Sequence, residues 1–229
     1  MLCIIPARSG SKGLKNKNIL PFNGKPLIYY TIQAALKTKK ITKIIVITDS
    51  LKIAKISKKF GAEIPFLRPK RLSTNNSLAI DTYIYVINKL KKKNIFVKEF
   101  IVLLPTSPLR NSFDIDNAIN LFKKKKADSV LSMKESECPL AWSKKISSSY
   151  LVKSPYKFFK SNFNRQYYQK TYVPNGAIYI FNSQKILKYK SYYFKKTYAY
   201  LMSKKKSIDV NDIIDFKIAE FLKKNSNNF

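Results

Sequence analysis

Short apolar runs alternate with amphipathic segments between residues 2 and 133. Residues 2–6 and 43–48 are apolar almost throughout, which is typical of strands buried on both faces of a sheet. Residues 26–36 carry apolar side chains three or four positions apart, which is helical spacing. Strands are predicted at residues 2–6, 43–48, 63–67, 100–104, 128–133, 177–181 and 198–202, and helices at residues 26–36, 51–60, 79–90, 112–125 and 212–222. The alternation predicts an α/β fold with a Rossmann-like, mainly parallel sheet and helices on both faces.

The rhythm breaks after residue 133. Residues 136–171 are rich in aromatic side chains, contain prolines, and show only weak strand signals near residues 150–153. We interpret this segment as a small insertion subdomain within a single domain of residues 1–229. We also expect it to form a subunit contact, because exposed aromatic side chains usually bury themselves against a partner.

The composition favours a globular protein of the cytoplasm. Hydrophobic residues make up 45% of the 229 residues, which is enough for a full core and too many for a disordered chain. The two cysteines, Cys3 and Cys138, are too few for a disulfide framework and favour a reducing compartment. The apolar run at residues 2–6 is too short for a signal peptide, and no run of about 18 apolar residues predicts a membrane span.

The formal net charge of +32 is nearly all lysine, spread along the whole chain. A nucleic-acid-binding surface is instead a localised basic patch. We therefore interpret the charge as a compositional drift and expect no nucleic-acid partner. The alternative is a lysine-rich nucleic-acid-binding protein, which requires a localised basic face with aromatic side chains for stacking.

Arginine and glycine are rare and clustered. Only five of the 45 basic residues are arginines, and an arginine grips phosphate or carboxylate with a planar fork of donors that lysine lacks. Three of the five lie in dense motifs at residues 7–13, 105–110 and 164–166. The first motif contains Gly10 and Gly13 and follows the first predicted strand, at the sheet edge where ligands bind. It predicts an anion-binding loop; the alternative is a basic surface turn.

Together the motifs resemble the acylneuraminate cytidylyltransferases, or CMP-sialic acid synthetases. The matching segments are residues 4–18, 25–30, 48–50, 68–69, 105–110, 165–166, 174–179 and 207–211. The resemblance implies a nucleotidyltransferase-type fold and the transfer of CMP from CTP to a nine-carbon 2-keto acid sugar, with release of pyrophosphate. It also implies a homodimer in which the partner reaches the sugar site.

The resemblance assigns the nucleotide to the first loop and the divalent cation to the C-terminal region. The implied nucleotide-binding residues are Arg8, Ser11, Lys12, Lys17 and Asn18. Mg²⁺, or Mn²⁺, is implied at Asp209 and Asn211, and the implied catalytic residues are Arg8, Lys17 and Asp209. The alternative for Asp209 is a helix cap three residues ahead of Asp212.

The sugar is assigned by resemblance to residues from the middle of the chain. The implied substrate-binding residues are Arg110, Arg165, Gln166 and Asn175. For Arg110, a structural ion pair within a rigid loop is an equal alternative.

Four positions depart from the family's pattern. Asn211 stands where the family has a second aspartate, Leu104 where sialic-acid enzymes commonly have glutamine, and Ala79 where the family often has serine or threonine. A lysine often found after the proline of the insertion is missing from residues 139–142. Three of the four concern the sugar or the metal, so they bear on the identity of the sugar; legionaminic or pseudaminic-type acids fit. Two further alternatives are an enzyme like CMP-Kdo synthetase, whose loop and C-terminal motif match less well, and an inactive homologue.

Overall fold

The computed structural model describes residues 1–10, 13–155 and 164–225. At its centre is a six-stranded sheet with the order β10-β6-β9-β5-β1-β4. Its strands are β1 (Leu2–Pro6), β4 (Lys43–Ile47), β5 (Glu99–Val102), β6 (Ser129–Glu135), β9 (Tyr172–Asn182) and β10 (Thr197–Leu201). Every pair is parallel except the two made by β9, which runs antiparallel to β5 and β6. The mainly parallel sheet predicted from the sequence is confirmed.

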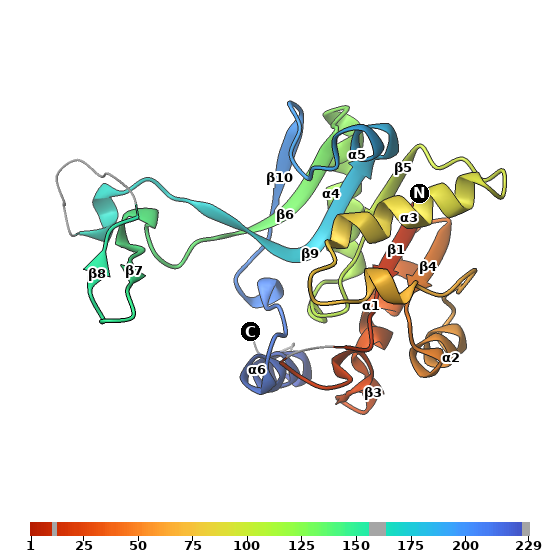
Figure 1. Cartoon of the computed structure of the whole chain (residues 1–229), viewed down its shortest axis with the longest axis horizontal. Coiled ribbons are helices and arrows are strands. Elements are labelled where there is room, and N and C mark those ends of the chain that lie inside the picture. The colour runs from red at the N-terminus through yellow and green to blue at the C-terminus, as the bar shows by residue number, and fades with distance from the viewer. Residues whose placement is uncertain (11–12, 156–163, 226–229) are drawn as a thin grey trace.

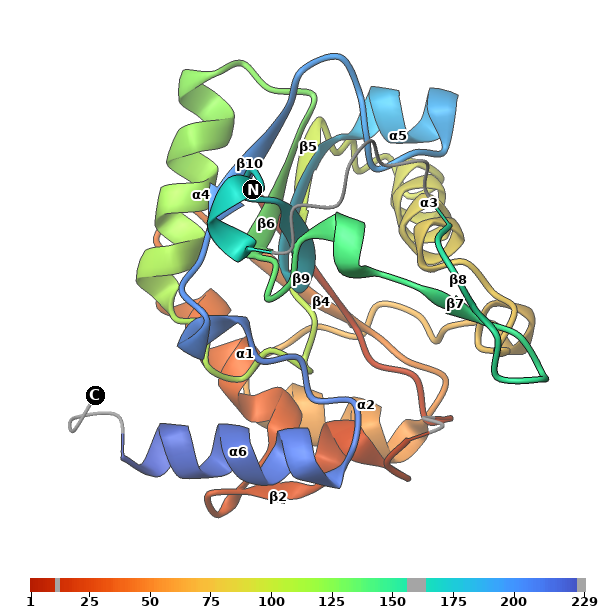
Figure 2. The same cartoon turned by 90° about the vertical axis from the view of Figure 1, so that its left-hand side faces the viewer.

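Helices cover both faces of the sheet, as predicted (Figures 1 and 2). One face packs against α1 (Leu27–Leu36), α2 (Leu51–Lys59) and α4 (Ser112–Lys124), and the other against α3 (Ala79–Lys91) and α5 (Ser183–Tyr189). Successive side chains of β1 divide between these layers, with Cys3 and Ile5 on the first face and Leu2 and Ile4 on the second. No helix in the described part of the chain is long and apolar enough to cross a membrane.

Two local predictions need correction. The strand predicted at residues 63–67 is wrong, since only Glu63 forms a bridge, with Ile45; Pro65 has no N–H with which to continue the ladder. The strand predicted at residues 177–181 is longer than expected, because β9 begins at Tyr172. The chain leaves the sheet at the end of β6 and returns beside that same end, where Glu135 pairs with Tyr172. For this reason β9 runs antiparallel to β6.

The last helix, α6 (Ile213–Lys224), forms a third layer below the sheet edge. It packs on the hairpin of β2 (Pro21–Phe22) and β3 (Lys25–Pro26), where the rings of Phe22 and Phe216 meet edge-on at 5.4 Å. Because α6 is anchored there, the residues just before it lie over the carboxyl ends of the parallel strands.

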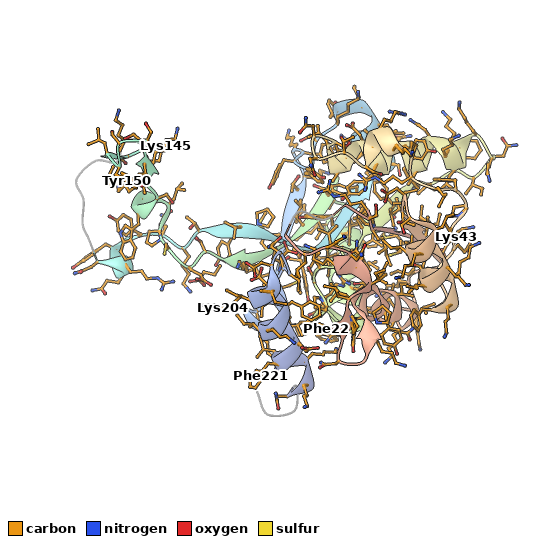
Figure 3. The ribbon with its side chains drawn as sticks, turned by 60° about the horizontal axis from the view of Figure 1, so that its bottom comes forward. Phe22, Lys43, Lys145, Tyr150, Lys204 and Phe221 are labelled. Atoms are coloured by element: carbon orange, nitrogen blue, oxygen red, sulfur yellow. The ribbon has the colours of Figure 1, made fainter. Side chains whose placement is uncertain are left out.

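Residues 136–155 and 164–171, which we call the arm, extend away from the sheet (Figure 1). Their described parts contain two 3₁₀ turns, η3 (Leu140–Trp142) and η4 (Arg165–Tyr167), and a small hairpin of β7 (Lys145–Ile146) and β8 (Val152–Lys153). Figure 3 shows Lys145 and Tyr150 far from Phe22 in the body. Large apolar side chains of the arm are exposed; Tyr150 is 86% accessible. The arm therefore has little core of its own.

Candidate active site

The loop after β1 is fixed at its start by a neighbouring strand end. The backbone N–H and the hydroxyl of Ser9 donate to the two carboxylate oxygens of Asp49, each at 2.8 Å. Asp49 follows β4, and the N-cap of α2 is Ser50, whose side chain accepts from Ile53 N–H. Asp49 is therefore available to hold the loop at the carboxyl edge of the sheet.

A cavity of about 630 Å³ opens beside this loop, and we call it the loop cavity. It is lined by three of the five predicted nucleotide-binding residues, Arg8, Lys17 and Asn18. The other two, Ser11 and Lys12, lie outside the described residues. The remaining lining residues include Arg68, Leu104 and Asn211.

Two arginines share this cavity. Arg8 Nη1 donates to the carbonyl oxygen of Thr74 at 3.0 Å and to Asn75 Oδ1 at 3.5 Å. Arg68 is buried and donates from Nη2 to the carbonyl oxygen of Leu72, while its Nε has no partner among the described residues. Burial lowers the pKa of Arg68, although Asp49 opposes that shift. Two guanidinium groups on one cavity favour an anionic ligand.

Arg68 was predicted only as part of a matching segment and without a role of its own. The available signal was its rarity: it is one of only five arginines in a lysine-rich chain. The cavity it lines could not be read from the sequence, because the walls come from segments far apart in the chain.

Lys17 and Asn18, in the 3₁₀ turn η1 (Lys17–Ile19), connect the loop to other parts of the site. Lys17 Nζ donates to the carbonyl oxygen of Val210 at 2.6 Å, and Asn18 Nδ2 donates to the carbonyl oxygen of Arg8 at 3.0 Å. Burial lowers the pKa of Lys17, and the nearby carboxylate of Asp209 counteracts part of that shift. A partly desolvated ammonium group thus faces the cavity.

Gly13 lies close to the backbone of Asn211, in the segment that carries Asp209. A Cβ on Gly13 would lie 2.3 Å from the backbone oxygen of Asn211. Such a contact is impossible without movement, and a backbone carbonyl cannot rotate away as a side chain does. The glycine is therefore required for close approach between the loop and the segment that carries Asp209.

We expect Gly13→Ala to lower both stability and activity. Overpacking of this kind typically costs about 1–3 kcal/mol, and it separates the loop from Asn211. Thermal unfolding and the kinetics of the reaction proposed below measure the two effects. The matched control for stability is Gly10→Ala, because a Cβ on Gly10 meets nothing within 4 Å. Equal melting temperatures for the two variants would contradict the close approach.

A second cavity of about 790 Å³ adjoins the first, and we call it the strand cavity because Asn175 and Gly176 of β9 line it. The two cavities share Leu104 and Asn211. Further lining residues of the strand cavity are Lys134, Tyr179, Lys204, Lys205 and Asp209. An anionic ligand in the loop cavity and a second ligand in the strand cavity would therefore meet beside Leu104 and Asn211.

Asp209 keeps one carboxylate oxygen without a partner. Its Oδ1 is buried and has no hydrogen-bond partner among the described residues. Its Oδ2 accepts a hydrogen bond from Asn211 Nδ2 at 3.4 Å. The alternative of a helix cap does not apply, because Asp212 itself caps α6 and forms a reciprocal box with Asp215. Asp209 thus keeps an oxygen free for a ligand.

The donor set at Asp209 fits a divalent cation held jointly with a nucleotide. Mg²⁺ prefers oxygen ligands and often takes one or two carboxylates together with phosphate oxygens. The amide of Asn211 presents its nitrogen to Asp209, so the amide must turn over to offer its oxygen to a metal. Among the described residues, no three His, Cys, Asp or Glu side chains converge on one point. Asp209 could therefore supply one charged ligand to such a cation, and a bound nucleotide and water could supply others.

Arg110 lines neither cavity, so the structure favours the structural alternative over the predicted substrate contact. It is 2% exposed, and its Nη1 donates to the carbonyl oxygens of Ala177 at 2.7 Å and Leu104 at 3.2 Å. Its Nη2 donates to Thr31 Oγ1 at 2.7 Å. Burial lowers the pKa of Arg110 to about 10. The guanidinium therefore has a structural role: it joins two backbone carbonyl oxygens and the hydroxyl of Thr31. These neutral acceptors stand in place of the carboxylate of an ion pair.

Arg165 and Gln166 lie on the arm and line neither cavity. They border a smaller hollow with residues such as Glu135 and Thr171. Arg165 also borders another hollow with Lys134, Glu137 and Lys204, and these three residues line the strand cavity as well. Neither Arg165 nor Gln166 lines a cavity together with Asp209.

A larger cavity than these two lies elsewhere. It measures about 1090 Å³ and is lined by residues such as Arg71, Tyr85 and Lys89 of the turn η2 (Lys70–Leu72) and helix α3. None of the predicted site residues lines it, and it is away from the strand ends that form the other two cavities. We therefore assign the chemistry to the two adjoining cavities.

Comparison with known proteins agrees with this assignment. The sequence profile described as "Cytidylyltransferase" matches residues 2–225. An N-acylneuraminate cytidylyltransferase of Escherichia coli O18:K1:H7 is 36% identical over 99% of this chain and 53% of that protein. This chain thus spans about half the length of that relative. A CMP-N,N'-diacetyllegionaminic acid synthase of Legionella pneumophila is 35% identical over 97% of this chain and 95% of that protein.

The fold has solved counterparts. The structure of CMP:2-keto-3-deoxy-manno-octonic acid synthetase complexed with CTP matches 98% of both chains with a TM-score of 0.72 at 15% identity. At that identity the likeness concerns the fold alone. The matched profile and the relatives at 35–36% identity, by contrast, extend over nearly the whole chain. The chain belongs to the cytidylyltransferase family.

Proposed function

We propose that the protein is a nucleotidyltransferase that transfers CMP from CTP to a nine-carbon 2-keto acid sugar and releases pyrophosphate. The observation that carries the proposal is the pair of cavities that meet at Leu104 and Asn211 beside the free carboxylate oxygen of Asp209. A triphosphate in one cavity and an acidic sugar in the other would come together at that boundary. The named activities of the relatives support the same reaction.

The loop cavity would hold CTP. Arg8, Arg68 and Lys17, which all line this cavity, supply the positive charge that a triphosphate requires. The strand cavity would hold the sugar, where Lys134 and Lys204 bring charge toward a carboxylate. The anomeric hydroxyl would then attack the α-phosphate in line, and pyrophosphate would leave toward the loop.

A divalent cation completes this arrangement. Mg²⁺, or Mn²⁺, would neutralise triphosphate charge when bound. Asp209 and Asn211 would hold it, and the buried, unpartnered Oδ1 of Asp209 supports this placement. Lys17 would keep the phosphates near Asp209, since both lie at the junction of the loop with residues 209–211.

The sugar would be sialic acid or a legionaminic or pseudaminic relative. Relatives named for all three acids match the chain, including a pseudaminic acid cytidylyltransferase of Campylobacter jejuni at 28% identity over 97% of this chain. Leu104 gives the boundary between the cavities an apolar side chain, which cannot hydrogen-bond a sugar hydroxyl. We therefore expect acids with fewer free hydroxyl groups to react better than sialic acid.

Pyrophosphate release tests the function. Purified protein is incubated with Mg²⁺, one of the four ribonucleoside triphosphates, and each of a panel of sialic, legionaminic, pseudaminic and Kdo acids. We expect release only with CTP and a nine-carbon acid. Release with Kdo alone would favour the CMP-Kdo alternative, and no release with any acid would favour an inactive homologue.

We also propose a cytoplasmic location. Both cysteines are free thiols, with Cys3 buried and Cys138 exposed on the arm. An exposed free thiol is compatible with a reducing compartment.

A homodimer would bring the arm to a second active site. Arg165 lies on the arm, outside both cavities of its own chain, and the arm exposes apolar side chains such as Ile146 and Tyr150. Both observations support a partner subunit that covers the arm and receives Arg165 near its strand cavity. Light scattering at micromolar concentration should then give about twice the chain mass of 26.5 kDa.

Mixed dimers test whether Arg165 acts across the subunit boundary. We expect Arg165→Ala and Asp209→Ala to be nearly inactive alone. Co-expression with two different tags yields mixed dimers, each of which has one site with both residues intact if Arg165 acts on the partner. Random pairing should restore about a quarter of the wild-type activity. No recovery would place Arg165 in its own subunit's site, and a fully active monomer would contradict the dimer.

A further inference from the structure

Strand β9 contains a large bulge where it passes the strand cavity. Leu131 of β6 pairs with Tyr179 of β9, but Met133 pairs with Pro174, so residues 175–178 stand opposite the single residue Ser132. Bulges of this kind bend a strand and re-aim its residues, and they are frequent beside active sites. A bulge of this size loses ladder hydrogen bonds and needs other partners to keep its shape.

A chain of buried hydrogen bonds supplies those partners. Ser132 Oγ donates to Asn175 Oδ1 at 2.6 Å and accepts from the N–H of Ile178 at 2.7 Å. Asn175 Nδ2 donates to Ser207 Oγ at 2.8 Å, and Ser207 Oγ donates to the carbonyl oxygen of Ser203 at 2.7 Å. Ser132, Asn175 and Ser207 are 0%, 4% and 2% exposed. Buried polar groups joined in this way define one geometry, because each loses its partner if another moves.

The chain joins the bulge to the segment that carries Asp209. Ser207 ends the 3₁₀ turn η5 (Lys205–Ser207), two residues before Asp209. On the bulge, Gly176 has a φ of +77°, and a Cβ there would lie 3.9 Å from Asp209 Oδ2 and 3.3 Å from Leu104 Cδ1. Gly176 thus lies beside the carboxylate of Asp209, with space for only an ordinary contact if a Cβ were added.

We propose that Ser132, Asn175 and Ser207 are positioning residues that fix the carboxylate of Asp209 at the boundary between the two cavities. The proposal rests on the proposed function and deepens it. It also reassigns Asn175, which the sequence placed among the sugar ligands. Asn175 Oδ1 accepts from both Ser132 and the N–H of Ala177, and Nδ2 is bound to Ser207, so the amide is largely committed within the protein.

Small displacements of Asp209 should have large consequences. A cation shared between one carboxylate and a triphosphate has little protein structure to hold it, so its position depends on that carboxylate. Residues that orient metal ligands typically affect metal affinity or activity by about 10- to 100-fold when replaced. Replacing Ser132 or Ser207 should lower the stability of the fold only as much as the loss of any buried serine hydroxyl does.

Serine-to-alanine variants test the proposal. Ser132→Ala and Ser207→Ala each remove one hydroxyl of the chain. The matched control is Ser129→Ala, which removes a buried hydroxyl of the same strand that bonds to Tyr192 and Thr197 at the opposite end of β6. Three properties are compared: the melting temperature, kcat and KM for CTP, and the affinity for Mn²⁺ measured by electron paramagnetic resonance with CTP and without sugar.

We expect similar losses of melting temperature in all three variants. Mn²⁺ affinity and kcat should fall about 10-fold or more in Ser132→Ala and Ser207→Ala, with a smaller change in KM, and stay near wild type in Ser129→Ala. Equal Mn²⁺ affinity in the three variants would overturn the proposal. Because the Mn²⁺ measurement needs no sugar, a wild-type protein that fails to release pyrophosphate would refute the proposed function and still leave the positioning role measurable. A wild-type protein that binds no Mn²⁺ with CTP would refute the positioning role.

Discussion

Replacing Arg8 with alanine should lower kcat/KM for CTP about 100-fold. Among the described residues only its Nη1 donates hydrogen bonds, to Thr74 and Asn75, so much of the guanidinium fork remains available to a ligand in the loop cavity. A forked, charge-assisted contact to phosphate is one of the stronger polar interactions in proteins. Steady-state kinetics at saturating sugar, with CTP varied, measures the loss.

Two further arginine variants make this result specific. Arg8→Lys keeps the charge but loses the fork, so its kcat/KM should lie between those of the wild type and Arg8→Ala. Arg71→Ala removes an arginine that lines the separate cavity beside α3, and it should leave the kinetics near wild type. If Arg8→Ala and Arg71→Ala behave alike in folded protein, the loop cavity is not the triphosphate site.

The sheet and the first loop could be predicted from local sequence. The apolar run of β1 and the glycine, serine and basic residues that follow it lie next to each other in the chain, and a strand end fixes where they must be. The same holds for the end of β4, where the neighbouring polar residues Asp49 and Ser50 precede α2. The separate roles of these two residues could be assigned only from the tertiary structure. Ser50 caps α2, and Asp49 accepts hydrogen bonds from Ser9.

The fate of individual polar side chains could not be predicted in this way. Arg110 and Asn175 stand in motifs that match the family, yet both bond mainly to groups of the protein itself. Carbonyl oxygens and hydroxyls accept the same donors as a sugar or a phosphate, so residue type does not distinguish the two uses. The partners are distant in sequence: Arg110 reaches Ala177, and Asn175 reaches both Ser132 and Ser207.

The bulge and the position of the arm could not be predicted from the sequence for a related reason. A bulge is defined by two strands together, so the sequence of β9 alone reads as a short strand at residues 177–181. The arm lacks a regular apolar period, and many of the large apolar side chains in its described part are exposed. Local pattern could mark residues 136–171 as different, but it could not show that Arg165 would lie outside both cavities.

Asp209→Asn should abolish activity, by roughly 1000-fold or more in kcat, and leave the melting temperature unchanged or higher. The two expectations come from the same observation. The Oδ1 atom of Asp209 is buried without a partner among the described residues, which is costly for a charged carboxylate and less costly for a neutral amide. An amide, however, provides no negative charge for a divalent cation. A residue whose neutralisation stabilises the fold but removes activity is typical of a functional site.

Two variants and a chelator make the test of Asp209 decisive. Asp116→Asn neutralises a carboxylate that faces Lys40 at 3.9 Å on the surface and should change neither property. Asn211→Asp adds a second carboxylate beside Asp209 and should keep or raise the affinity for Mn²⁺, because it supplies charge that the amide lacks. Wild-type activity should disappear in excess chelator and return with Mg²⁺. Full activity in chelator, or an active Asp209→Asn variant, would remove Asp209 from the chemistry and leave its buried oxygen without a role.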